Sequence, residues 1–206
     1  MNFEEAIEQA VEDSEDRNFT ESIDLIMNFR GLDLSDPNNR INDDLKLPNQ
    51  ADEDIKIAVI GDSLSGGNAD RQVTEDELEE MFDEPNKAKT LADEFTFLIA
   101  EAPLMPKIGQ QLGQVFGPRN MMPDPTPPGS DLEDEIEDLR NTVSLSVKEQ
   151  PLLQIKVGKE DHEADEVARN ASTVYNFVEE NLPEGRNNIK NVMIKTTMGP
   201  SVEVDN

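Results

Sequence analysis

The period of the apolar residues changes along the chain, and this change constrains the fold more than any other feature. Alternating apolar positions from Ile23 to Phe29 match the period of a half-buried strand. Further along, apolar positions recur at helical spacing in a stripe that stops before Pro183. The stripe consists of Ala164, Val167, Ala168, Ala171, Val174, Tyr175, Val178 and Leu182. Because both periods are present, we predict a mixed α/β protein.

Helical and strand-like patterns alternate through the rest of the chain. The sequence becomes polar after Gly61, over residues 62–74, which indicates that a new unit begins there. Residues 117–129 hold five prolines and are expected to form a loop. We expect further helices near residues 3–11, 75–81, 86–93, 105–116 and 132–139, and further strands near 45–47, 55–60, 95–100, 142–147, 152–158, 189–197 and 201–204.

The charge balance bears on the partners that the chain can bind. It has 46 acidic and 18 basic residues and a formal net charge of −28, which in dilute buffer would repel nucleic acids and anionic membranes. In molar salt the Debye length falls to about 3 Å, and this long-range repulsion disappears. The acidic residues are spread among regular apolar positions, so they indicate a hydrated surface adapted to salt rather than a disordered tail.

Composition also limits the chemistry and the compartment. The chain has no cysteine, which excludes disulfides, thiolate metal sites and cysteine nucleophiles. No apolar run approaches the roughly 18 residues of a membrane span, and the first residues do not resemble a signal peptide. We therefore expect a cytoplasmic protein that does not enter a membrane.

One motif suggests an enzyme. Gly61-Asp62-Ser63-Leu64 follows an expected strand and resembles the nucleophile block of the Gly-Asp-Ser-Leu serine esterases. Such an enzyme needs a histidine that takes the serine proton, usually from an Asp-x-x-His turn. The chain has a single histidine, His162, and the position three residues before it is Lys159. We therefore keep the esterase only as a remote alternative and expect no enzymatic activity.

Other cofactor and metal motifs are also missing from the sequence. Gly61, Gly66 and Gly67 match neither a dinucleotide fingerprint nor a phosphate loop with its lysine. Neighbouring carboxylates such as Glu79 and Glu80 are too common in this chain to mark a catalytic pair or a ligand set. We predict no cofactor and no metal site.

Two longer segments resemble the ribosomal protein L-one family, in its archaeal form. Residues 195–202, Lys-Thr-Thr-Met-Gly-Pro-Ser-Val, are similar to its C-terminal signature. Residues 112–125, Leu-Gly-Gln-Val-Phe-Gly-Pro-Arg-Asn-Met-Met-Pro-Asp-Pro, are similar to its Leu-Gly-x-x-Leu-Gly-Pro-Arg-Gly-x-Met-Pro-x-Pro stretch, with Phe116 for leucine and Asn120 for glycine. Asparagine tolerates positive φ, so the turn at Asn120 survives if the glycine was left-handed. Shorter matches in the same order are residues 17–22, 38–40, 47–48, 57–61, 98–100, 104–106 and 157–158.

The resemblance implies an α/β architecture with two domains. A discontinuous domain one, residues 1–61 plus 154–206, is expected to contain a split β-α-β unit in an α+β sandwich and to bind RNA. Domain two, residues 62–153, is expected to be an inserted, Rossmann-like, three-layer α/β unit. Two short connections between the domains would form a hinge.

The resemblance also implies a function and a site. Such proteins are structural constituents of the large ribosomal subunit, bind its ribosomal RNA in the mobile stalk, assist release of deacylated transfer RNA from the exit site and often repress translation of their own messenger RNA. We expect the same partners here, a monomer when free, and, as an alternative, an RNA-binding homologue outside the ribosome. The expected RNA-binding residues are Asn18, Phe19, Ser22, Asp24, Asn191, Lys195, Thr197, Met198 and Gly199.

Each expected site residue also has an ordinary structural explanation. Residues 198–200 are compatible with a simple hairpin turn, Phe19 with a core position and Ser22 with the cap of a local turn. In the RNA-binding interpretation, Thr197 and Ser22 offer hydroxyls to ribose and phosphate, while Asp24 accepts from a 2′-hydroxyl. Asn18 stands where relatives often carry a basic residue, which removes one phosphate contact.

Overall fold

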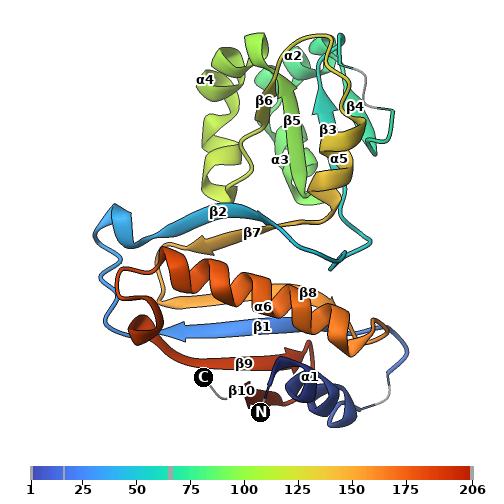
Figure 1. Ribbon diagram of the computed structural model, residues 1–206. Helices are drawn as coiled ribbons and strands as arrows, with labels where there is room; N and C mark the ends of the chain where they lie inside the picture. Colours follow the sequence, from blue (N-terminus) through green and yellow to red (C-terminus); the bar gives the residue numbers. More distant parts are fainter. Residues whose placement is uncertain (1, 16, 65–66, 205–206) are drawn as a thin grey trace. The chain divides into compact units, whose positions relative to one another are not determined.

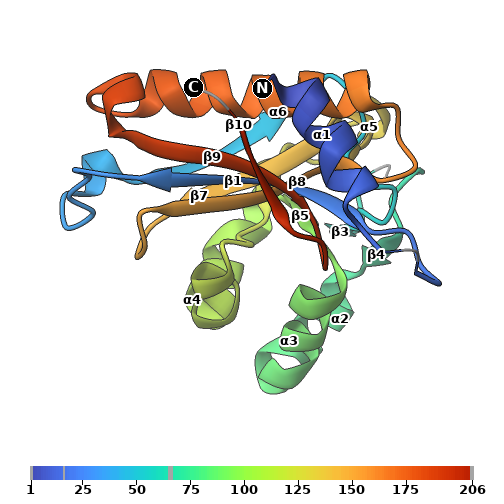
Figure 2. The same cartoon turned by 90° about the horizontal axis from the view of Figure 1, so that it is seen from below.

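A computed structural model describes residues 2–15, 17–64 and 67–204 (Figures 1 and 2). The chain forms two compact units, unit 1 (Met1–Glu53 and Asn141–Asn206) and unit 2 (Asp54–Arg140). Unit 1 contains α1 (Phe3–Glu12), α6 (Ala164–Asn181), the 3-10 helices η1 (Pro37–Asn39) and η4 (Gly185–Asn188), and strands β1 (Ser22–Phe29), β2 (Ile41–Lys46), β7 (Thr142–Val147), β8 (Leu152–Lys159), β9 (Ile189–Thr196) and β10 (Ser201–Val204). Unit 2 contains α2 (Glu75–Asp83), α3 (Pro85–Glu94), α4 (Met105–Phe116), α5 (Glu133–Arg140), η2 (Ala102–Leu104), η3 (Gly117–Arg119), β3 (Ile57–Ile60), β4 (Arg71–Val73), β5 (Phe97–Glu101) and β6 (Asp124–Thr126).

Unit 1 is built on a four-stranded antiparallel sheet in the order β10-β9-β1-β8. Strand β1 pairs antiparallel with both β8 and β9, so β8 and β9 run parallel to each other and α6 connects them. This arrangement is the predicted split β-α-β unit. Strands β2 and β7 form a separate antiparallel pair in the same unit.

Both helices of unit 1 pack on one face of this sheet (Figure 2). In β1 the predicted alternation is confirmed, since every second side chain from Ile23 to Phe29 is buried in the core. The helical stripe between residues 164 and 182 forms α6, and its buried residues belong to the same core. The intervening polar residues of β1 therefore lie on the opposite face, which neither helix covers.

Unit 2 is a three-layer α/β unit around a parallel sheet in the order β4-β3-β5-β6. The two faces of the sheet contribute to separate cores, because Ala58 and Ile60 of β3 pack with α2, α3 and α4, whereas Ile57 and Val59 pack with α5. The chain leaves α4 and η3 through Asn120, which has φ 58° and ψ 34°. The asparagine thus adopts the left-handed conformation that the sequence comparison anticipated.

The units divide at other positions than the predicted domains. Strand β3, expected in domain one, pairs in parallel with β4 and β5 and belongs to unit 2. Strand β7, expected in domain two, pairs with β2 and belongs to unit 1. The predicted domain boundaries lie after residues 61 and 153, whereas the boundaries between the two units lie after residues 53 and 140. The difference arises from strand pairing, which the sequence does not reveal.

Candidate nucleic-acid interface

The nine predicted RNA-binding residues all belong to unit 1 and lie on or beside two neighbouring strands. We call them the β1–β9 face: Asn18, Phe19, Ser22, Asp24, Asn191, Lys195, Thr197, Met198 and Gly199. In the pairing of the strands, Asp24 lies opposite Lys195 and Asn28 lies opposite Asn191. The fold thus brings together two segments that are about 170 residues apart in the sequence.

The named strand residues of this face are polar with nearly balanced charge, and half-buried Ile26 and Met193 lie opposite each other between them. Asp24 lies in register between Lys195 of β9 and Lys156 of β8, and its carboxylate accepts a hydrogen bond of 3.0 Å from Gln154 Nε2. Beside them, Asn28 Nδ2 donates to Asn191 Oδ1 over 2.9 Å. Apart from the exposed Gln154 these side chains are half-buried, and together they offer both donors and acceptors.

Two large apolar side chains stand at one end of the face. Phe19 is 56% exposed and lies just before β1, and Met198 is 59% exposed and lies just after β9. The start of β1 and the end of β9 pair with each other. Among the described residues of unit 1 no other large hydrophobic residue is similarly exposed. Exposed aromatic and thioether groups at a polar rim are typical of a surface that binds a partner. Phe19 is therefore not a core residue.

The loop of residues 197–199 is held in place by the start of β1 and the end of β9. The N–H of Thr197 donates to Ser22 O over 3.0 Å, and the hydroxyl of Thr197 donates to the same oxygen over 3.3 Å. The N–H of Gly199 donates to Thr196 Oγ1 over 3.1 Å. A Cβ atom at position 199 would collide with that hydroxyl oxygen, so any other residue here would have to displace Thr196.

Glu21, which the sequence analysis did not single out, is the central residue of this loop attachment. Its side chain is 1% exposed, and its Oε2 accepts a hydrogen bond of 2.8 Å from the N–H of Met198. Arg17 Nε lies 2.8 Å from Oε1. The hydrogen bond from Met198 lowers the pKa of Glu21 below its ordinary value of 4.5. Burial acts in the opposite direction, whereas the nearby Thr196 hydroxyl and the Arg17 charge lower the pKa further.

The hydrogen bonds leave the loop with a defined chemical character. The N–H groups of Thr197, Met198 and Gly199 all donate within the protein. The loop therefore offers a partner no backbone donor from these three residues, but carbonyl acceptors and the thioether of Met198. Such a surface suits groups that donate, such as hydroxyls and amines, better than it suits phosphate oxygens.

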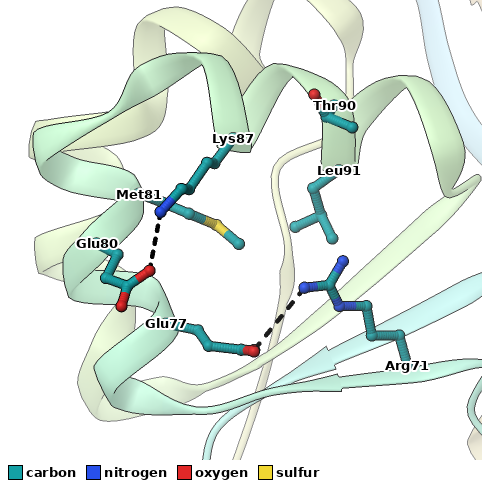
Figure 3. A pocket seen from close by; sticks show the side chains of 7 residues that line it. All are labelled: Arg71, Glu77, Glu80, Met81, Lys87, Thr90 and Leu91. Carbon is teal, nitrogen blue, oxygen red and sulfur yellow. Dashed lines mark hydrogen bonds and ion pairs between the residues drawn. The ribbon is translucent and has the colours of Figure 1, made fainter.

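Unit 2 contains a cavity that is an alternative candidate site, drawn in Figure 3. Its volume is about 280 Å³, and Met81 and Leu91 form part of its lining. The two cations that point into it are already close to carboxylates, since Arg71 lies 3.9 Å from Glu77 and Lys87 lies 2.9 Å from Glu80. Because these pairs neutralise each other, the cavity has no excess positive charge with which to hold a phosphate.

The Gly-Asp-Ser-Leu motif lies at the end of β3 in unit 2. The N–H of Ser63 donates to Glu101 Oε1 over 2.6 Å. In a serine esterase, backbone N–H groups beside the nucleophile must be available to the oxyanion of the intermediate. A buried carboxylate at that place opposes the reaction, and the esterase alternative loses its support. The next residues, Ser65 and Gly66, lie outside the described part of the chain.

No group of three or more histidine and acidic side chains in residues 2–15, 17–64 and 67–204 is arranged to hold a metal ion. Within the same residues, no helix combines the length and the hydropathy that crossing a membrane requires.

Comparison with known proteins finds relatives that align with nearly the whole chain. The chain is 40% identical over 205 residues to the large ribosomal subunit protein uL1 of Methanothermobacter thermautotrophicus, and the alignment covers 97% of each chain. It is 41% identical to the uL1 protein of Natronomonas pharaonis, over 98% of this chain and 97% of the relative. The uL1 protein of Pyrococcus abyssi is 42% identical, over 97% of this chain and 94% of the relative. These relatives are named as ribosomal subunit proteins and not as enzymes.

A protein-family model also matches nearly the whole chain. The model of the ribosomal protein L1p/L10e family matches residues 10–200, which include both halves of the β1–β9 face and the whole of unit 2. The match is therefore continuous across both units and is not confined to the two sequence signatures. The chain belongs to the ribosomal protein L1p/L10e family.

Proposed function

We propose that the chain is a structural constituent of the large ribosomal subunit and that it binds ribosomal RNA of that subunit through the β1–β9 face. The observation that carries the proposal is the position of Phe19 and Met198, two exposed apolar side chains from distant segments, at the end of one polar sheet face. The names of the relatives and the family support the ribosomal part of the proposal.

The chemistry of the face explains how so acidic a chain binds RNA. The loop of residues 197–199 presents acceptors, and Asp24 is a further acceptor, so ribose 2′-hydroxyls and exocyclic amines are the complementary groups on RNA. Phe19 and Met198 add apolar contact with bases, and salt does not weaken apolar contact. Lys195 contributes a single positive charge, so few counterions are released on binding.

The proposed role extends to transfer RNA and messenger RNA. As part of the mobile stalk, the protein assists the release of deacylated transfer RNA from the exit site. It also represses translation by binding a site on its own messenger RNA that imitates the ribosomal site. Unit 1, which carries the β1–β9 face, is the RNA-binding domain in this proposal, and the free protein is a cytoplasmic monomer that associates with the large subunit.

The direct test is binding of the recombinant protein to a stalk-region ribosomal RNA fragment in molar KCl. We expect tight binding by the wild type, weaker binding by Thr197→Ala, and loss of binding by Met198→Asp, which replaces an exposed apolar side chain of the face with a negative charge. Met122→Asp is the matched control, because Met122 is also exposed, at 40%, but belongs to unit 2. Equal loss in Met122→Asp and Met198→Asp would contradict the assignment to the β1–β9 face.

A second measurement separates the ribosomal protein from an RNA-binding homologue outside the ribosome. Sedimentation of a cell extract in molar KCl should place the protein with the large subunit. If the protein binds RNA but remains in the free fraction, its role is extraribosomal. A folded wild-type protein that binds no stalk fragment would overturn the proposed RNA site.

A further inference from the structure

A buried carboxylate connects the two halves of the β1–β9 face. Glu21 lies between Phe19 and Ser22 in the first half, and its carboxylate accepts from the N–H of Met198 in the second half, 177 residues away. Because the side chain of Glu21 is 1% exposed, it is too deep to contact RNA itself. Its influence on a partner must act through the residues that it holds.

Each oxygen of this carboxylate has one donor or cation against it. Met198 N–H donates to Oε2 over 2.8 Å, whereas Oε1 accepts no hydrogen bond and forms an ion pair with Arg17, whose Nε lies 2.8 Å away. A carboxylate is the side-chain group that accepts at both of its oxygens. A glutamine at this position would turn an N–H₂ group toward Arg17 or toward Met198, and either orientation leaves two donors facing each other.

The contact to Met198 fixes the middle residue of the loop. Met198 N–H is bonded to the Glu21 carboxylate, whereas Gly199 N–H is bonded to the Thr196 hydroxyl and Thr197 N–H to Ser22 O, so Met198 is the loop residue that depends on the carboxylate directly. Without this attachment, residues 197–199 would gain conformational freedom and would have to be ordered when RNA binds.

We propose that Glu21 is a positioning residue for RNA recognition, which holds Met198 in its binding conformation before RNA arrives. The inference rests on the proposed function, and it adds a residue that does not touch the partner. Glu160 also contacts Glu21, but through the backbone: Glu160 Oε1 accepts a hydrogen bond of 3.0 Å from Glu21 N–H. The amide oxygen of a glutamine can accept the same hydrogen bond, so Glu160 is the matched control position.

The experiment compares wild type, Glu21→Gln and Glu160→Gln in molar KCl, with two readouts. Amide hydrogen exchange at Met198 in the free protein reports the attachment of the loop, and the dissociation constant for the stalk-region RNA fragment reports its consequence. For Glu21→Gln we expect exchange at Met198 to be at least about tenfold faster and RNA binding to be about tenfold weaker. Glu160→Gln, which removes the same charge from the same neighbourhood, should leave both quantities near wild type.

A second variant keeps the test valid if Glu21→Gln does not fold. Arg17→Gln retains the carboxylate and removes one of its partners, a side chain that is 29% exposed, and should change both readouts in the same direction by a smaller factor. Faster exchange at Met198 with unchanged RNA affinity would overturn the proposal, and so would unchanged exchange in folded Glu21→Gln. If wild-type protein binds no RNA while Glu21→Gln still loosens Met198, the proposed function fails and the role of Glu21 is limited to the fold.

Discussion

A Cβ atom added to Gly158 would lie 2.6 Å from Cγ2 of Val167, so α6 packs onto β8 without room for a side chain. Gly158→Ala must therefore displace the helix or Val167, and we expect it to lower the free energy of unfolding by about 1–3 kcal/mol.

Gly109→Ala is the opposite case. Gly109 is exposed within α4, no atom lies within 4 Å of its added Cβ, and alanine should stabilise the helix by about 0.5–1 kcal/mol. Urea unfolding followed by circular dichroism measures both; a neutral Gly158→Ala would contradict the close packing.

The sequence predicted the long and strongly periodic elements better than the short ones. The helix from Ala164 and the strand from Ser22 have buried faces at the expected spacing, because burial and period have the same cause. The strands β4 and β6 were not predicted. Both have three residues at the edges of the sheet in unit 2, and β6 contains Pro125, which an edge strand tolerates. Elements this short carry no readable period.

The candidate site was predictable only where a signature marks it. Residues 195–202 resemble the family signature, and the structure places Thr196 and Thr197 beside Ser22 and Ile23 of β1; that the face binds RNA stays a prediction. Glu21 was missed because one buried carboxylate among 46 acidic residues has no sequence pattern that distinguishes it from a solvated one. For Gly199 the structure supplies an internal reason for glycine, because the Thr196 hydroxyl occupies the space that a side chain would need.

The left-handed conformation of Asn120 makes its substitution predictable. With φ 58°, alanine at this position would carry the steric cost of a left-handed residue, about 1–2 kcal/mol, whereas glycine carries none. We expect Asn120→Ala to destabilise unit 2 and Asn120→Gly to leave its stability near wild type or slightly higher. Thermal unfolding of the two variants in one buffer decides the matter. Equal melting temperatures for both would show that the backbone rearranges at this turn.

The low pKa of Glu21 predicts a pH dependence of stability. The folded-state pKa lies below the ordinary value of 4.5, so the stabilising contribution of the carboxylate is complete above about pH 4.5 and is lost as the pH falls through the folded-state value. Glu21→Gln should therefore differ most from wild type above that pH, and the difference should shrink in more acidic solution. Urea unfolding of both proteins in molar KCl from pH 3 to pH 7 measures it. Glu160 and Glu15 are nearby carboxylates that are present in both proteins, so the comparison isolates Glu21.

The acidic surface predicts that folding depends on salt. A net charge of −28 on 206 residues makes the compact state repel itself, and salt screens this repulsion when the Debye length becomes shorter than the spacing of the charges. We expect the protein to be folded in molar KCl and to lose helical circular dichroism on dilution below roughly 0.5 M. Sucrose at equal osmolality is the control, because it favours compact states without screening charge. Recovery of the circular dichroism signal by KCl but not by sucrose would support charge screening. An unchanged spectrum down to millimolar salt would contradict the prediction, because it would show that the cores of the two units outweigh the charge repulsion without screening.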